Sequence, residues 1–104
     1  MNPIIVPDWR DFVAFSPEGP QPRILAEMAN LKVILGGLEA GQRIPTHPEG
    51  LATYCFLEGN GWMTVEDERF AVRAGMVVIT PAGARRGVEA ESRLAFLTSR
   101  VGQE

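Results

Sequence analysis

The sequence predicts an all-β domain of the barrel or sandwich class. Short runs rich in valine, leucine, isoleucine and phenylalanine alternate with turn signals about every ten residues, a spacing typical of such folds. Helix signals are scarce along the 104 residues. A chain of this length forms one domain and removes roughly two thirds of its unfolded surface from water, so it can bury a core.

The N-terminal part is expected to form an arm. Asp8 can cap a short helical turn that places Trp9, Phe12 and Val13 on one side. The proline-rich stretch 16–22 then forms an irregular linker. Residues 1–22 are therefore assigned to an arm and linker, and residues 23–104 to a barrel on which the arm packs, within a single domain.

The barrel is expected to contain short strands joined by tight turns. The pair Asn60-Gly61 suits a hairpin turn, and Asp67-Glu68 suits a second one. The predicted strands span residues 23–28, 31–38, 51–58, 62–66, 69–72, 76–80, 87–90 and 93–100.

A two-part frame of glycine, proline and histidine is the most specific pattern in the sequence. Its parts are Gly41 to Gly61, with His47 between them, and Gly75 to Pro81-Ala82-Gly83. The pairing resembles the two motifs of the small single-domain cupins, the cupin 2 conserved barrel family, over about residues 24–101. The resemblance implies a cupin-type jelly-roll β-barrel. It also implies a divalent metal held by three histidines and a glutamate.

Most of those metal ligands are replaced here. Counted from the first glycine of the motif, His47 takes the place of the first histidine, Glu49 of the second and Tyr54 of the glutamate. Counted back from the strand ending at 57–59, Ala52 takes the place of the glutamate and His47 becomes the second histidine. Both registers predict the same inward face, because side chains alternate along a strand. That face contains Pro45, His47, Glu49, Ala52, Tyr54 and Phe56.

In the second motif, Arg86 stands where the resemblance implies the third histidine. Arginine stays protonated and has no acceptor, so it cannot ligate a cation. His47, Glu49 and the weak ligand Tyr54 make a poor site, since transition metals are normally held by three or more protein ligands. The sequence therefore predicts a degenerate metal motif and no cofactor.

The side chains that remain suit an anion-binding pocket. An inward Arg86 needs an anion, supplied either by Glu49 or by the carboxylate or phosphate of a ligand. The alternatives are an Arg86 turned outward beside Arg85, and a Glu49 that is a solvated rim residue. Tyr54 either packs in the core or orients a polar ligand through its hydroxyl. The predicted ligand-binding residues are His47, Glu49, Tyr54 and Arg86, and no catalytic residue is assigned.

The single cysteine, Cys55, excludes an intramolecular disulfide and a zinc site built on several cysteines. It fits a reducing compartment, and the N-terminus lacks the pattern of a secretory signal, so a cytoplasmic location is expected. Cys55 and His47 would lie roughly 26 Å apart on one continuous strand, which argues against a nucleophilic dyad. With one histidine and no serine–aspartate signature, a hydrolase triad is not supported.

Charge and composition narrow the function further. The net charge is −3 and Lys32 is the only lysine, which argues against a nucleic-acid partner. No stretch approaches the length of a membrane span. The leading hypothesis is a metal-independent pocket that binds a small anionic organic molecule in a binding or sensing role.

Two other hypotheses stay open. The resemblance implies a metal-dependent enzyme of the dioxygenase, isomerase or decarboxylase type, so whether the protein is an enzyme is undecided. The second hypothesis is a purely structural dimer whose barrel is filled by its own side chains and binds no ligand. A homodimer is expected in any case, because apolar side chains gather on the arm and the barrel edges are unpaired. Those side chains are Trp9, Phe12, Val13 and Phe15.

Overall fold

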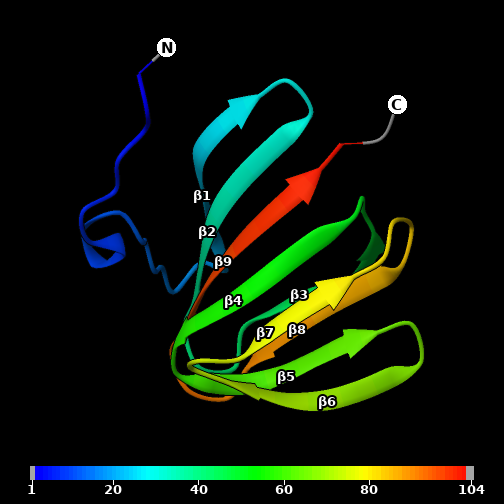
Figure 1. Ribbon diagram of the computed structural model, residues 1–104. Coiled ribbons are helices and arrows are strands. Elements are labelled where there is room, and N and C mark those ends of the chain that lie inside the picture. The colour runs from blue at the N-terminus through cyan, green and yellow to red at the C-terminus, as the bar shows by residue number, and fades with distance from the viewer. Residues whose placement is uncertain (1, 103–104) are drawn as a thin grey trace.

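The chain folds into two antiparallel sheets that face each other, as expected for a jelly-roll barrel. The computed structural model describes residues 2–102. One sheet has the strand order β1-β2-β9-β4-β7 and the other β3-β8-β5-β6 (Figure 1). The all-β jelly-roll prediction is therefore confirmed. The strands are β1 (Gln21–Met28), β2 (Leu31–Leu38), β3 (Arg43–Pro48), β4 (Ala52–Glu58), β5 (Asn60–Val65), β6 (Glu68–Arg73), β7 (Val77–Thr80), β8 (Arg85–Ala90) and β9 (Leu94–Val101).

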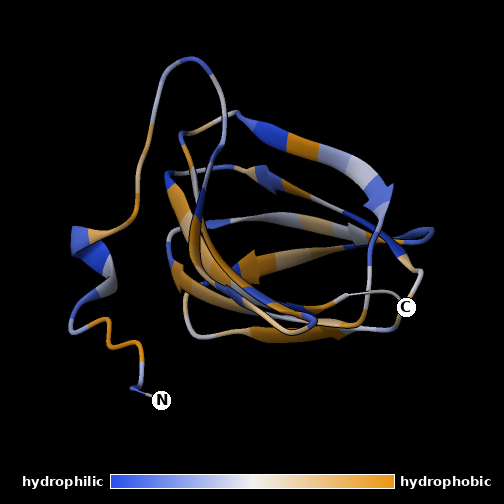
Figure 2. Cartoon of the chain, turned by 90° about the horizontal axis from the view of Figure 1, so that it is seen from above, coloured by the Kyte–Doolittle hydropathy of each residue, from blue (hydrophilic) through white to orange (hydrophobic). Residues whose placement is uncertain are grey.

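The core lies between the two sheets. Along β4, burial alternates as expected for a strand with one inward face: Ala52, Tyr54 and Phe56 are buried. The rings of Tyr54 and Phe56 both pack on Phe96 of β9, with centroids 5.7 and 5.8 Å away. Figure 2 shows the hydrophobic residues concentrated in the strands around this interior. The inward face predicted for β4 is confirmed.

Strand β3 was not predicted from the sequence. Pro45 and Pro48 lack the N–H that a central strand needs, but β3 is an edge strand, where proline is tolerated. Its pairing with β8 shifts register between Ile44 and His47, so both side chains turn toward the interior. The predicted inward position of Pro45 is wrong for this reason, since Pro45 lines a groove on the outer side of the sheet. Gly87 makes room for the bulge, because a Cβ there would lie 2.7 Å from the Ile44 carbonyl oxygen.

The predicted hairpin at Asn60-Gly61 is also wrong. Strands β4 and β5 belong to different sheets, and Gly59 is the corner at which the chain passes from one to the other. Gly59 has a φ of 83°, and a Cβ there would collide with the carbonyl oxygen of Arg93. The second hairpin does form, between β5 and β6, but its turn lies at Glu66-Asp67. Glu66, with a φ of 53°, adopts the left-handed conformation in this turn.

The N-terminal arm lies outside the barrel, along the outer face of the larger sheet (Figures 1 and 2). It contains the 3-10 turn Trp9–Asp11, capped by the Asp8 side chain, which accepts from the Arg10 backbone N–H at 3.0 Å. Gly37 of β2 lets the arm approach, because a Cβ there would collide with the backbone of Ala14. Within residues 2–102, no helical segment has the length and hydropathy needed to cross a membrane.

Candidate ligand-binding pocket

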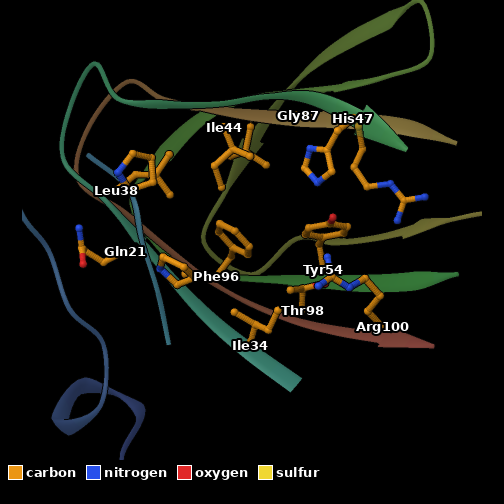
Figure 3. Close-up of a pocket in the computed structure, with 16 residues that line it drawn as sticks. Gln21, Ile34, Leu38, Ile44, His47, Tyr54, Gly87, Phe96, Thr98 and Arg100 are labelled. Carbon is orange, nitrogen blue, oxygen red and sulfur yellow. The ribbon is translucent and has the colours of Figure 1, made fainter. Parts of the chain in front are cut away.

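The barrel interior holds a cavity of about 260 Å³ between the two sheets. In Figure 3, Ile44 and His47 point into it from one sheet and Tyr54, Phe96 and Thr98 from the other. Its walls are mainly apolar toward Ile44 and Leu38, and polar toward His47. The apolar side chains are Pro20, Pro22, Ile34, Leu38, Ile44, Val88 and Phe96, and the polar end is lined by His47, Tyr54, Arg86, Thr98 and Arg100.

Arg86 lies inside the barrel, with 1% of its surface exposed. Its guanidinium donates only to backbone carbonyls: Nε to Ala84 at 2.9 Å, Nη1 to Gly50 at 2.7 Å, and Nη2 to Glu49 and Pro81 at 3.1 and 3.0 Å. No carboxylate within residues 2–102 forms an ion pair with it. Arg86 therefore ties the β3–β4 loop to the β7–β8 turn while adding a positive charge to the cavity wall.

Glu49 occupies the rim of the same end. Its carboxylate Oε2 lies 3.1 Å from His47 Nε2 and 3.2 Å from Arg100 Nη1. The carboxylate thus bridges β3 of one sheet and β9 of the other. The sequence predicts either the Glu49 carboxylate or a ligand anion as the partner of Arg86. In the structure Glu49 contributes its backbone carbonyl to Arg86 and not its side chain. The Glu49 side chain is 29% exposed, which places it between a solvated rim residue and an interior one.

His47 is held between two oxygen acceptors. Its Nδ1 lies 2.9 Å from the Pro45 carbonyl oxygen, and its Nε2 faces the Glu49 carboxylate. Both contacts are hydrogen bonds at once only when the ring carries a proton on each nitrogen. His47 and Arg86 are directly opposite each other on β3 and β8. The sequence-predicted residues His47, Tyr54 and Arg86 therefore all line one cavity, with Glu49 at its edge.

Two further residues of this end were not identified from the sequence. Thr98 and Arg100 follow each other on the inward face of β9, and Thr98 lies opposite Tyr54 on β4. The Thr98 hydroxyl is buried and is the one such side-chain atom without a hydrogen-bond partner within the described residues. The alternation of residues 94, 96, 98 and 100 in the last strand was the available signal, because it puts a threonine and an arginine on the inward face.

Cys55 takes no part in this pocket. It lies on the opposite face of β4 from Tyr54, half-buried, and pairs across the sheet with Val77 and Leu97. The outward position agrees with the sequence argument against a dyad with His47, which faces the interior.

Comparison with known proteins identifies the family. A family model for the cupin domain matches residues 34–99. The chain belongs to the cupin family. Structures similar to this cupin include a conserved protein of unknown function from Streptococcus pyogenes, which shares 25% identity with a TM-score of 0.85 over 100% of this chain and 92% of that one.

Two further structures have the same fold. A protein from Thermus thermophilus has 24% identity and a TM-score of 0.83 over 94% of this cupin and 98% of that chain. An uncharacterized conserved protein with a double-stranded β-helix domain from Klebsiella pneumoniae has 19% identity and a TM-score of 0.84, over 92% and 88% of the two chains. A comparison with curated protein sequences gave no match.

The residues of this cupin do not fit the metal that its fold family implies. Between residues 2 and 102, no group of three or more His, Cys, Asp or Glu side chains is placed to hold an ion. His47 and Glu49 contact each other, and Arg86, opposite His47, adds a fixed positive charge where a further ligand would be needed. A cation bound here would have two protein ligands and a guanidinium as its neighbour.

Proposed function

We propose that this cupin binds a small anionic organic molecule inside its barrel without a metal, as a binding or sensing protein of the cytoplasm. The observation that carries the proposal is the cavity itself, which has apolar walls and a polar end rich in cations. Such a concave apolar site with a few convergent polar groups is the usual form of a small-molecule pocket.

The charges at the polar end favour an anion. Arg86 and Arg100 bring two fixed positive charges to the cavity wall, and Glu49 brings one negative charge. His47 adds a third positive charge when it is protonated. This local excess of positive charge stands out in a chain whose net charge is −3. In a low-dielectric interior, an uncompensated cation attracts a ligand anion more strongly than it would in water.

The size of the cavity restricts the ligand. Pockets for drug-sized molecules measure roughly 300–1,000 Å³, and this cavity of about 260 Å³ lies just below that range. A metabolite with a single ring or a short branched chain fits, whereas a nucleotide does not. The free volume also argues against the hypothesis of a purely structural barrel filled by its own side chains.

The metal-dependent enzyme remains the competing hypothesis for a member of this family. It requires ligands that His47 and Glu49 alone do not supply. Metal analysis of protein purified without added metal tests the two functions directly. We expect well under one equivalent of iron, manganese, nickel, copper or zinc, and no fall in the melting temperature on adding a chelator. A stoichiometric metal that is lost on changing His47→Ala would support the enzyme instead.

Binding itself is tested by calorimetric titration of the wild-type protein with a panel of small organic acids. The matched variant is Ile44→Trp, which places a larger apolar side chain in the cavity wall. We expect saturable 1:1 binding of at least one acid to the wild type and loss of that binding in Ile44→Trp. Equal binding by both proteins would place the ligand outside the barrel and contradict the proposal.

A further inference from the structure

We propose that the ligand is a monocarboxylic acid with an apolar body, and that Arg100, with the hydroxyls of Thr98 and Tyr54, binds its carboxylate by displacing Glu49. This inference rests on the proposed function and identifies the group that selects the anion. It assigns that role to Arg100 in place of Arg86, the arginine that the sequence motif singles out.

Arg86 has little capacity left to bind a ligand. A guanidinium has five N–H donors, and Arg86 makes four hydrogen bonds to backbone carbonyls. Those carbonyls belong to the loops that close this end of the barrel, so turning the side chain toward a ligand would leave them unpaired. Arg86 contributes its positive charge to the pocket, while its N–H groups remain hydrogen-bonded to the backbone carbonyls.

Arg100 is placed to make the contact that Arg86 cannot. It lines the interior cavity and also a second, surface pocket that contains Glu27, Lys32 and Glu49. Its side chain is 21% exposed, so it lies at the junction between the barrel interior and solvent. Within residues 2–102, Glu49 is the only carboxylate in ion-pair contact with it, with its Oε2 3.2 Å from Nη1. When Glu49 is displaced, the planar guanidinium can donate two parallel hydrogen bonds to a ligand carboxylate.

The Thr98 hydroxyl gives an independent sign of a ligand. Buried polar groups nearly always have a hydrogen-bond partner, and each one that lacks a partner destabilises the protein. Thr98 is 5% exposed, lines the cavity, and has no partner for its Oγ1 within the described residues. Tyr54 is directly opposite it on β4, also at the cavity wall. A carboxylate oxygen in the cavity beside these two side chains would accept from the Thr98 hydroxyl.

In the free protein the Glu49 carboxylate occupies the position at Arg100 that the ligand carboxylate would take. It holds Arg100 at 3.2 Å and His47 at 3.1 Å. A ligand carboxylate replaces it at Arg100 without leaving Glu49 unpaired, because Glu49 keeps its contact with His47. The exchange of one carboxylate for another balances the charge, and it explains why a site built for an anion is stable without one.

The apolar end determines the rest of the ligand. Leu38, Ile44 and Phe96 face the cavity away from the rim, together with the polar side chain of Gln21 (Figure 3). The Gln21 amide at this end already donates to the Gly19 carbonyl at 3.1 Å, and the two arginines that line the cavity lie at the other end. A second carboxylate here would therefore be buried without a cation to pair with, which is strongly unfavourable. Aromatic or branched aliphatic monocarboxylates fit this arrangement, and dicarboxylates do not.

The test compares benzoate with benzamide, which has the same shape without the charge, by calorimetry on the full chain. We expect benzoate to bind and benzamide to bind at least about tenfold more weakly. Arg100→Met keeps much of the apolar stem and should weaken benzoate binding by at least about tenfold, with little effect on benzamide. The exposed neighbour of Arg86 provides the control, since Arg85→Met should bind benzoate as the wild type does.

Two further variants separate ligand binding from a structural role. Thr98→Val keeps the shape and removes the unpaired hydroxyl, so it should raise the melting temperature of the free protein and weaken benzoate binding several-fold. Glu49→Gln removes the competing charge and should tighten benzoate binding several-fold.

The outcomes distinguish this inference from the proposed function. If Ile44→Trp abolishes benzoate binding while Arg100→Met binds it as the wild type does, the cavity binds ligand but Arg100 does not select it, and the inference is overturned alone. Equal affinity for benzoate and benzamide would also overturn the inference alone, because it would show that the cavity does not select a carboxylate. If no acid of the panel binds the wild type, the proposed function and the inference about Arg100 are both overturned. Unchanged binding in Glu49→Gln overturns the displacement step.

Discussion

At the scale of single residues, position 86 has an arginine, a cation, in place of a residue that would bind a cation. Where the family resemblance implies a metal-binding histidine, Arg86 is present and donates to four backbone carbonyls. The metal implied by the resemblance gathers histidine and glutamate side chains around a positive charge, whereas the guanidinium gathers carbonyl oxygens of two neighbouring loops. Arg86 can therefore be understood as a covalently attached cation that organises the end of the barrel.

Arg86→Ala should destabilise the protein by about 3 kcal/mol or more, because four carbonyls lose a charged donor, two of them in buried hydrogen bonds. Arg86→Lys should recover only part of the loss, since an ammonium cannot reproduce the planar fork. Urea denaturation measures both. The control is Arg85→Ala, an exposed position, which should change the free energy of unfolding by no more than about 0.5 kcal/mol. Equal effects at 85 and 86 would show that the carbonyl contacts contribute no stability.

The sequence predicted which residues gather at the site more readily than what they do there. Motif spacing brought His47, Tyr54 and Arg86 to one cavity, because a two-residue period fixes the inward face of a strand. It did not predict that the donors of Arg86 point to carbonyls or that Arg100 holds Glu49. Those contacts join segments that are 36 and 51 residues apart, and local patterns contain no information on such pairings.

At the scale of elements, the errors arise where the chain leaves a regular pattern. The prolines of β3 obscure a strand, since proline argues against any strand except an edge. Asn60-Gly61 has the composition of a hairpin, yet β4 and β5 separate into different sheets at Gly59. Turn composition predicts that the chain bends, but the packing of the two sheets decides whether the following strand pairs with the preceding one.

Two glycines allow the corner to be tested separately from backbone strain. Gly59 and Gly83 both have a φ of 83°, but only at Gly59 would a Cβ meet other atoms. Gly83→Ala should cost about 1–2 kcal/mol from the left-handed conformation alone. Gly59→Ala should cost at least about 2 kcal/mol more, because the Cβ collides with the Arg93 backbone. Thermal or urea unfolding gives the difference, and equal losses would show that the corner tolerates the added atom.

The loops near this corner are connected by an ion pair that depends on pH. Arg93 donates to both carboxylate oxygens of Glu39 at 2.9 Å and stacks over Phe15 of the arm, 4.3 Å from its centroid. These hydrogen bonds hold the pKa of the Glu39 carboxyl below its usual value, against the opposing effect of desolvation.

The stabilisation from a lowered carboxyl pKa is fully present above the ordinary pKa of the group and is lost as the pH falls through the lowered one. Glu39→Gln should therefore be less stable than the wild type at neutral pH and equally stable in acid. The difference at neutral pH should be small, because the pair is exposed. Unfolding curves at several pH values measure this, with Glu68→Gln as the control. A difference that persists in acid would show that Glu39 acts through something other than its charge.

At the scale of the whole molecule, the outer face of the larger sheet is incompletely covered. On the edge strand β7, Val77 and Ile79 are 61% and 69% exposed, and they lie beside Cys55 and Thr53 of β4 on that outer face. The arm covers another part of the same face and adds Ile5, which is 72% exposed. Exposed apolar side chains gathered on one face of a small protein usually mark an interface.

We expect this face to pair with a second copy of the chain, because a homodimer buries the exposed strand and the arm of both copies at once. Light scattering at micromolar concentration should give the mass of a dimer. Ile79→Lys places a charge on the outer face and should shift the protein to a monomer. Ile24→Lys is the matched control, since Ile24 is 55% exposed but pairs with Ile34 on the other side of the sheet, and it should remain dimeric. A monomeric wild type would remove the prediction, and dissociation by both variants would place the interface elsewhere.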